Sequence, residues 1–539
     1  MSKNNKSNLP AKKRAAILQR KWYLYLTEFF AGMSVMAVEL GASRLLAPYF
    51  SSSQIVWTII IGTIMIAMAL GNIYGGKSAD KNPDPDKLYK RILVAAVWIA
   101  AIPFLGKFAV IGVSALLVVT VNTNFLIWAA FITCMVVFVY PLFLLGTVTP
   151  SLVKYTVDSL DESGKTVGTL GAFNTIGSII GTFIPTFVSI PTVGTSITFL
   201  IFAGVLLALA VIYFISAHRG AVKTGTSAAL FLVCCLVGNR LNFAFWEKDL
   251  AYEGESVYNY LQVKEDDYHT ALSTNVLFGV QSVYMKSGEL TGMYYDYAMA
   301  APLMSGAENC DMLILGMGTG TYATQCMRYF DNVKAEGVEI DDRITDLARE
   351  YFALPESVKV TTYDGRAFLN VSSKQYDVIM VDAYQDITIP FQMSSKEFFE
   401  LVKAHLKPNG VMVVNMNMRS KKSDGINSYL SDTIASCFDN VYTVDVPNST
   451  NRELFASCSD DIISNFTQRA AETENSELYE LMSKVNDSLV PYKGGDLILT
   501  DDKAPVELLG MSVIDDLIQD ELVYYRERFK EEGIQGVIG

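Results

Sequence analysis

Three predicted strands each end in an acidic residue, and a glycine-spaced turn precedes all three of them. The turn, Gly316-Met317-Gly318-Thr319-Gly320, follows the apolar strand Leu313-Ile314-Leu315. Because glycine has no Cβ, a ligand can approach the backbone N–H groups that face outward where a strand turns sharply into a helix. Glu339 lies 23 residues after Gly316, near the distance at which nucleotide-binding α/β folds place the carboxylate that binds ribose hydroxyls. This spacing predicts an adenosine pocket.

The other two acidic residues complete this pattern. Asp364 follows a third strand, and Asp382 ends a fourth, Tyr376–Asp382. A carboxylate at a strand end can also cap the next helix, and for Asp341 and Asp342 that structural role is the one we expect. For Glu339, Asp364 and Asp382 we predict contact with a ligand.

Strands and helices alternate around these residues. Helices are predicted at about 320–330, 342–352 and 395–406, which implies an α/β Rossmann-like domain over 305–539 with its ligand at the carboxyl ends of a mainly parallel sheet. Short strands precede it and predict a small β-hairpin domain over 241–304; they lie at Tyr260–Val263, Ala271–Thr274, Val276–Phe278 and Val283–Met285.

The first 240 residues differ in composition from the rest of the chain. They hold 19 Lys or Arg and 8 Asp or Glu, a net charge of +11, whereas the remaining residues hold 24 and 48, a net charge of −24. Most of the apolar runs in this first part reach the ~20 residues that cross a bilayer; they lie at about 22–46, 54–75, 92–121, 125–150, 168–190, 196–216 and 225–239. We therefore predict a polytopic α-helical membrane domain over 22–240 with six to eight spans.

Basic residues gather in the N-terminal segment 1–21 and in alternate loops, which places these parts in the cytoplasm. If 225–239 does not cross, the soluble domain is cytoplasmic too; if it crosses, the domain lies outside, unless 92–121 is a hairpin of two spans. We expect a multi-pass protein of the cell membrane with a cytoplasmic catalytic domain. Three charged residues lie inside the first apolar run, and they form either an internal ion pair or a polar passage for a substrate: Glu28, Glu39 and Arg44.

Composition also excludes several functions. An acidic soluble half does not bind nucleic acid, since phosphates require clustered Lys and Arg. The seven cysteines form no C-x-x-C pattern and the only histidines are His218, His269 and His405, too few parts for a zinc site or a Ser-His-Asp hydrolase. We expect no metal.

Several segments resemble the spermidine synthase (polyamine aminopropyltransferase) family, in particular its membrane-fused, multi-pass branch. Ser256–Val263 looks like S-x-Y-Q-x-I-x-V, and Gln281 like the glutamine after the family's β-hairpin. Tyr295-Asp296-Tyr297 stands at Y-H-E, Val381–Asp386 at V-D-S-T-D-P, and Thr500–Glu507 resembles the tail T-D-D-x-A-P-V-E.

The resemblance implies transfer of an aminopropyl group from decarboxylated S-adenosylmethionine to an amine such as putrescine, with release of methylthioadenosine. Asp382 would be the carboxylate base, with Tyr384 and Asp386 lining the amine site. Glu339 would bind the ribose hydroxyls and Asp364 the adenine amino group. The further residues implied are Asn259, Gln281, Gly316, Gly318, Thr319, Gly320, Ile340 and Gly365 for the co-substrate, and Tyr295, Asp296 and Gln385 for the amine. The expected partners are a small-molecule amine and the lipid bilayer, with a homodimer as an open alternative.

Four positions depart from the family pattern. Thr319 stands where the family turn has an aspartate that holds the aminopropyl ammonium, Asn259 replaces a glutamine, Asp296 a histidine and Gln385 an aspartate. Intact S-adenosylmethionine, with transfer of an aminocarboxypropyl group, therefore stays open. So do an S-adenosylmethionine-dependent methyltransferase acting on a lipid-soluble acceptor and a polyamine transporter or sensor with a nucleoside-binding domain.

Overall fold

The computed structural model divides the chain into two compact units. The helical unit comprises residues 1–46, 56–116 and 127–243, and the α/β unit comprises 47–55, 117–126 and 244–539. The structure describes residues 16–532 except 51, 122, 157–162, 239–242, 245–246, 248–249, 275–278, 384–388, 418 and 420–422.

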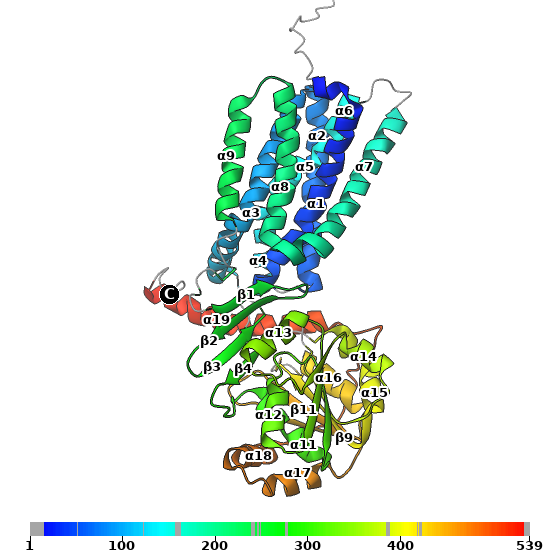
Figure 1. Cartoon of the computed structure of the whole chain (residues 1–539), viewed down its shortest axis with the longest axis vertical. Coiled ribbons are helices and arrows are strands. Elements are labelled where there is room, and N and C mark those ends of the chain that lie inside the picture. The colour runs from blue at the N-terminus through cyan, green and yellow to red at the C-terminus, as the bar shows by residue number, and fades with distance from the viewer. Residues whose placement is uncertain are drawn as a thin grey trace, which may run out of the picture. The chain divides into compact units, whose positions relative to one another are not determined.

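The helical unit is built from long apolar helices (Figure 1). A short 3-10 helix, Ala16–Gln19, precedes α1 Lys21–Phe50, α2 Gln54–Lys81, α3 Pro85–Thr120, α4 Phe125–Val137, α5 Val139–Gly146, α6 Val148–Thr156, α7 Ser163–Ile184, the π-helical turn Pro185–Ser189, α8 Ile190–Ser216 and α9 Ala221–Val237. Within the described ranges, four helical runs are long and apolar enough to cross a membrane, and the bent pair 125–137 and 139–156 makes a fifth. One of the four, Ser163–Ser216, contains the non-helical Gly194 and joins two of the predicted segments.

Small residues bring α1 and α7 together. A Cβ added to Gly177 would lie 2.0 Å from the carbonyl oxygen of Phe29, and one added to Gly181 would lie 2.1 Å from that of Met33. Such contact between backbones is typical of helices packed in a bilayer. The same helices hold the fully buried Glu28, whose Oε1 accepts from Thr149 Oγ1 (2.5 Å) and Asn174 Nδ2 (2.9 Å).

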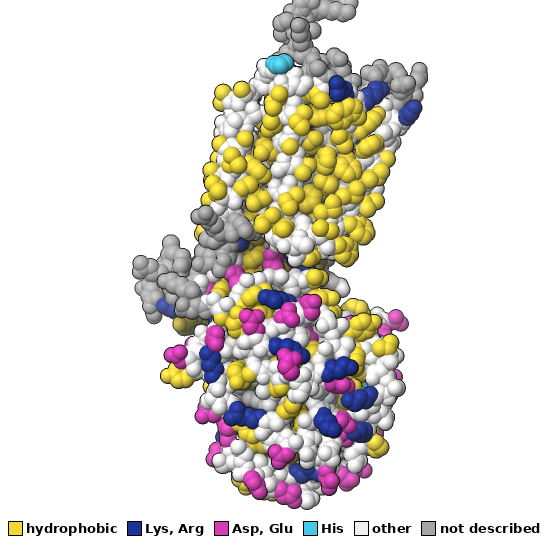
Figure 2. All heavy atoms as spheres, in the orientation of Figure 1, with side chains coloured by type: hydrophobic (Ala, Val, Ile, Leu, Met, Phe, Trp, Pro, Cys, Tyr) yellow, Lys and Arg dark blue, Asp and Glu magenta, His cyan; other side chains and the backbone are white. Residues whose placement is uncertain are grey.

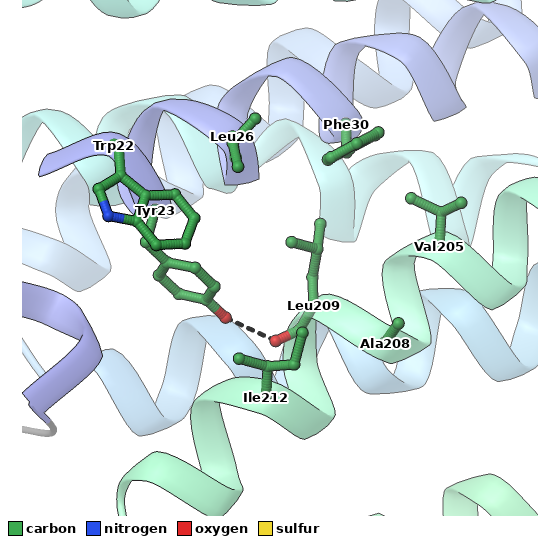
Figure 3. Close-up of a pocket in the computed structure, with 8 residues that line it drawn as sticks. All are labelled: Trp22, Tyr23, Leu26, Phe30, Val205, Ala208, Leu209 and Ile212. Carbon is green, nitrogen blue, oxygen red and sulfur yellow. Dashed lines mark hydrogen bonds between the residues drawn. The ribbon is translucent and has the colours of Figure 1, made fainter. Parts of the chain in front are cut away.

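A small pocket lies between α1 and α8 (Figure 3). Its lining side chains are apolar apart from the Trp22 indole nitrogen and the Tyr23 hydroxyl, which donates to the carbonyl oxygen of Leu209 (2.5 Å). The pocket therefore offers no charged group to a polar ligand.

The α/β unit contains a small antiparallel sheet of four strands in the order β1-β2-β3-β4. The strands are β1 Leu250–Glu255, β2 Tyr260–Glu265, β3 His269–Ser273 and β4 Ser282–Met285. The predicted strands at 260–263, 271–274 and 283–285 correspond to the last three, and β1 was not predicted. The predicted strand Val276–Phe278 lies wholly in the undescribed range 275–278. Leu261, Val263 and Leu272 of this sheet pack against Leu347 and Phe352.

The main sheet has the order β12-β10-β11-β9-β8-β5-β6-β7. Strands β5 to β9 are parallel, whereas β10, β11 and β12 join antiparallel. The strands are β5 Cys310–Leu315, β6 Val333–Glu339, β7 Lys359–Thr362, β8 Tyr376–Val381, β9 Leu406–Met416, β10 Asn440–Asp445, β11 Arg452–Ser457 and β12 Val490–Pro491. The expected Rossmann-like domain is confirmed, and its mainly parallel sheet is mixed through the antiparallel strands β10 to β12.

Helices cover both faces of this sheet and bury its central strands, as parallel sheets require; Val378 to Val381 are fully buried. The helices are α10 Tyr294–Ala298, α11 Ala300–Ser305, α12 Thr321–Tyr329, α13 Asp342–Tyr351, α14 Gly365–Val371, α15 Lys396–Ala404, α16 Ile426–Ala435, α17 Ile462–Ala471, α18 Ser476–Ser488 and α19 Val506–Glu532, with a 3-10 turn at Phe391–Met393. The predicted helices at 320–330, 342–352 and 395–406 correspond to α12, α13 and α15.

The segment after β12 is fixed to the domain by Asp501. Both carboxylate oxygens of Asp501 accept from the Arg366 guanidinium at 2.7 Å, and Oδ1 also accepts from Ser395 Oγ at 2.6 Å. Bidentate pairs of this kind are the stronger ion pairs. The Arg366 hydrogen bonds lower the pKa of Asp501 to about 2.

We expect Asp501→Asn to destabilise the domain by about 1 kcal/mol, a value reduced for the partial exposure of the pair. Because the folded-state pKa is depressed, this stabilisation is present above the unfolded pKa of about 3.9 and is lost as pH falls toward 2. Urea unfolding at pH 7 measures the difference. The exposed neighbour Asp502→Asn is the control and should leave the midpoint unchanged; equal midpoints for both variants would contradict the assignment.

Candidate active site

The glycine turn of the candidate site connects β5 to α12. Gly316, Gly318 and Gly320 have φ angles of 79°, 54° and 75°, a region that side chains with a Cβ rarely adopt. A Cβ on Gly316 would lie 2.6 Å from Asp382 O and Ala383 Cα. The turn after β5 therefore lies directly against the residues that follow β8, and Gly320 ends it as the N-cap of α12.

The side chain of Glu339, at the end of β6, binds this turn through a hydrogen bond. Its Oε2 accepts from Gly318 N (2.8 Å) and its Oε1 accepts from Asp341 N (3.1 Å), while the side chain is 7% exposed. Burial raises the pKa of the carboxyl, and these backbone N–H groups oppose the shift. The Glu339 carboxyl is thus held at the carboxyl ends of β5 and β6, where α/β sheets bind ligands.

Asp341 begins α13 and also joins the small sheet to the site. Its Oδ1 accepts from Arg343 N (3.1 Å), so the expected helix-start role is confirmed. Its Oδ2 accepts from Ser256 Oγ (2.5 Å) and Asn259 Nδ2 (2.8 Å). The structure therefore places the predicted co-substrate residue Asn259 against Asp341, beside Glu339.

Two further predicted residues flank the end of β7. Asp364 is the N-cap of α14 and accepts from Ala367 N (2.8 Å), and Gly365 begins the helix. Ile340, which follows Glu339, is 41% exposed. The Ile340 side chain is therefore accessible from solvent beside the carboxylates at these strand ends.

Asp382 lies at the end of β8, with its N–H donating to Leu315 O (2.9 Å). Its Oδ2 accepts from the Tyr294 hydroxyl (2.5 Å), and its Oδ1 accepts from Asn415 Nδ2 (2.9 Å). Burial raises the pKa of Asp382 to about 7, although both hydrogen bonds oppose the shift. A carboxyl of this kind can accept and release a proton near neutral pH.

In the described part of the chain, the hydrogen bonds of three other predicted residues, Thr319, Tyr295 and Asp296, go to partners other than Asp382. Thr319 is 1% exposed and its hydroxyl pairs with that of Thr321 (3.0 Å). The Tyr295 hydroxyl both donates to and accepts from the backbone of Val283 (2.9 Å each). Buried Asp296 accepts from Thr291 Oγ1 (3.0 Å) and Gly292 N (2.6 Å), which fixes the turn before α10.

Four predicted site residues remain: Gln281, Tyr384, Gln385 and Asp386. Gln281 directly precedes β4, and its N–H donates to Leu272 O (2.8 Å). Tyr384, Gln385 and Asp386 lie in the range 384–388, outside the described residues.

The sequence reasoning missed Tyr294 and Asn415. For Tyr294 a signal was present, because Tyr294-Tyr295-Asp296 also matches Y-H-E with a tyrosine first and a carboxylate third. In that register Tyr294, rather than Tyr295, stands at the family's tyrosine, and Tyr294 is the residue that donates to Asp382. No motif pointed to Asn415, which lies within the apolar strand β9 and meets Asp382 only in the folded sheet.

Comparisons with known proteins identify the family of this chain. A family model described as the spermine/spermidine synthase domain matches residues 292–467. A protein of Bifidobacterium longum named "Probable polyamine aminopropyl transferase" is 53% identical over 351 residues, which cover 61% of this chain and 77% of that protein. The chain belongs to the spermine/spermidine synthase family. It is therefore a transferase.

More distant members of the spermine/spermidine synthase family also match. A polyamine aminopropyltransferase of Vibrio vulnificus is 26% identical over 235 residues, covering 42% of this chain and 76% of that protein. The spermidine synthase structure from Thermotoga maritima is 19% identical, with a TM-score of 0.37, and covers 44% of this chain and 84% of that one.

The matched family domain contains the groups described above. Tyr294, Glu339, Asp382 and Asn415 all lie within 292–467. Among the described residues, no group of three or more His, Cys, Asp or Glu side chains could hold a metal ion.

Proposed function

We propose that this protein transfers an aminopropyl group from decarboxylated S-adenosylmethionine to a small amine such as putrescine and releases methylthioadenosine. The environment of Asp382 is the observation that carries this proposal. Asp382 is a half-buried carboxyl with a pKa of about 7, oriented by Tyr294 and Asn415 and adjacent to the glycine turn.

The reaction asks for positioning and for one proton transfer. The substrate ammonium gives a proton to the Asp382 carboxylate, and the free amine nitrogen attacks the methylene carbon beside the sulfonium. A C–N bond forms, the C–S bond breaks, and its electron pair returns to sulfur as a neutral thioether. General-base help of this kind contributes about 10²–10⁴-fold, and in-line positioning adds to it.

The pH profile tests the role of Asp382. Because burial raises its pKa to about 7, the ionised base is scarce below that pH, and kcat/KM should fall about tenfold per unit as pH decreases. The Tyr294 hydrogen bond lowers this pKa, so Tyr294→Phe should move the acidic limb to higher pH. Tyr297→Phe, on the same helix, is the control; identical profiles for all three proteins would remove Asp382 from the role of base.

For the co-substrate we propose the decarboxylated form, and we keep intact S-adenosylmethionine as the second candidate because of Thr319. A like charge at this position would repel a carboxylate, and threonine supplies none. Calorimetry of the detergent-solubilised chain with both compounds, followed by addition of putrescine, decides between them. Release of methylthioadenosine supports alkyl transfer, release of S-adenosylhomocysteine supports methyl transfer, and binding without either product supports a sensor or transporter.

We further propose that the helical unit is embedded in a membrane, with the transferase domain in the cytoplasm, where adenosyl co-substrates are available. This location requires that α9 does not cross. Its 17 residues span about 26 Å, short of the ~30 Å hydrocarbon core.

An exposed cysteine of the α/β unit, Cys458, tests the location. A membrane-impermeant maleimide applied to intact cells should leave Cys458 unlabelled until the membrane is opened. Cys458→Ser identifies the labelled site, and labelling in intact cells would place the domain outside.

A further inference from the structure

A second buried carboxyl lies beside Asp382 in the sheet. Glu453, in β11, is fully buried and stands directly opposite Asn415 of β9. Residues opposite each other in an antiparallel pair point to the same face, with Cβ atoms about 4.5–5.5 Å apart. Since Asn415 Nδ2 donates to Asp382 Oδ1 (2.9 Å), strands β8, β9 and β11 present Asp382, Asn415 and Glu453 in one row.

Within the described part of the chain, neither carboxyl oxygen of Glu453 has a hydrogen-bond partner. The side chain of Asn415, which could have served, instead donates to Asp382 and accepts from Asn451 Nδ2 (2.8 Å). An ionised carboxylate buried without a partner costs several kcal/mol. Glu453 is therefore neutral in the ligand-free protein, and burial, followed by the charge of Asp382, raises its pKa well above the ordinary range.

The groups that face Glu453 do not supply a positive charge. Helix α10 contacts both β9 and β11 and contributes Tyr294, α12 contributes Tyr322, and β8 contributes Asp382. Burial raises the pKa of both tyrosines, so they stay neutral at neutral pH.

A purely structural role does not explain this glutamate. A leucine has a similar volume and would fill the same space without the cost of a buried polar group. Buried groups with perturbed ionisation gather at functional sites, where stability is given up for activity. The missing partner is a positive charge, and the proposed acceptor is a cation.

We propose that Glu453 is a specificity-determining residue that gives the acceptor site a second negative charge when a diammonium substrate binds. In the empty site Asp382 and Glu453 cannot both ionise readily, because like charges in one buried site oppose each other. A dication offsets both charges, so Glu453 releases its proton to solvent as the amine binds. The site then favours diamines over monoamines of the same length. This inference rests on the proposed amine acceptor.

Two measurements on the Glu453→Gln variant test the proposed role of Glu453. The first is the ratio of kcat/KM for putrescine to that for butylamine, which should fall about tenfold or more, since one charge contact of roughly 1.4 kcal/mol is worth a factor of ten. The fall should arise mainly from KM. The second is the number of protons released when putrescine binds in the presence of methylthioadenosine, measured by calorimetry in buffers of different ionisation enthalpy; the variant should release fewer.

Two more variants separate this role from a structural one. Glu400→Gln, exposed on α15, should change neither readout. Glu453→Leu should raise the urea midpoint and still lose diamine preference, whereas a structural glutamate would give a lower midpoint. Unchanged selectivity and unchanged proton release in Glu453→Gln would overturn the inference. Proton release needs no turnover, so a wild-type protein that forms no methylthioadenosine would refute the proposed function and leave this readout decisive for Glu453.

Discussion

Asp382→Asn should lower kcat by about 10²–10⁴-fold while the adenosyl co-substrate still binds. The amide keeps the size of the carboxyl and can still pair with Tyr294 and Asn415, but it cannot take a proton from the substrate ammonium. The glycine turn and Glu339, which we assign to the nucleoside, are untouched. Single-turnover assays with putrescine and calorimetric titration with decarboxylated S-adenosylmethionine measure the two effects separately.

Asp377→Asn is the matched control, because Asp377 lies on the same strand at its opposite end. It accepts from Lys407 Nζ (2.7 Å) and Asp311 N (2.9 Å), far along the strand from the site. This variant should lose some stability and keep its kcat. If Asp382→Asn instead abolished co-substrate binding and kept the chemistry of bound molecules, Asp382 would belong to the nucleoside pocket.

The second large effect is expected for Gly316→Ala, which should abolish detectable co-substrate binding. The φ of +79° costs a residue with a Cβ about 1–2 kcal/mol, and the new Cβ would lie 2.6 Å from backbone atoms of Asp382 and Ala383. Since those atoms are backbone, relief requires the turn and the end of β8 to separate, which moves Asp382 as well.

Gly279→Ala provides the comparison. This glycine of the α/β unit has no heavy atom within 4 Å of an added Cβ, and its φ lies outside the left-handed region. It should bind the co-substrate as the wild type does. Thermal unfolding of both variants, together with titration of the co-substrate, checks the prediction; normal binding by Gly316→Ala would show that the turn can relax.

The parts of the site that depend on local sequence could be predicted. The strand-to-helix turn at Gly316 and the carboxylates Glu339 and Asp382 at strand ends follow from glycine geometry and from the periodicity of apolar residues. Asp341 as a helix N-cap follows from the same local rules and is found in the structure.

The parts of the site that depend on pairing between distant strands could not be predicted from the sequence. Asn415 reaches Asp382, 33 residues away in sequence, only because β9 lies beside β8. Glu453 precedes three buried apolar residues of β11, Leu454 to Ala456. Its neighbour Asn415 is set by the register of an antiparallel pair that the periodicity does not specify. The parallel pattern also gave no sign that β10 to β12 would join antiparallel.

The Asp501–Arg366 pair has a consequence for how this protein can be divided. The matched family region stops at residue 467, yet the chain beyond it supplies Asp501 to Arg366, two residues after the helix cap Asp364. The carbonyl oxygen of Leu499 also accepts from Lys396 N, and its N–H donates to the Thr433 hydroxyl (2.9 Å each). A protein shortened to the matched region, residues 292–467, would lose these contacts and loosen α14, the helix that follows the predicted adenine site. The region that the family model matches is thus smaller than the unit that must be kept whole for the domain to fold.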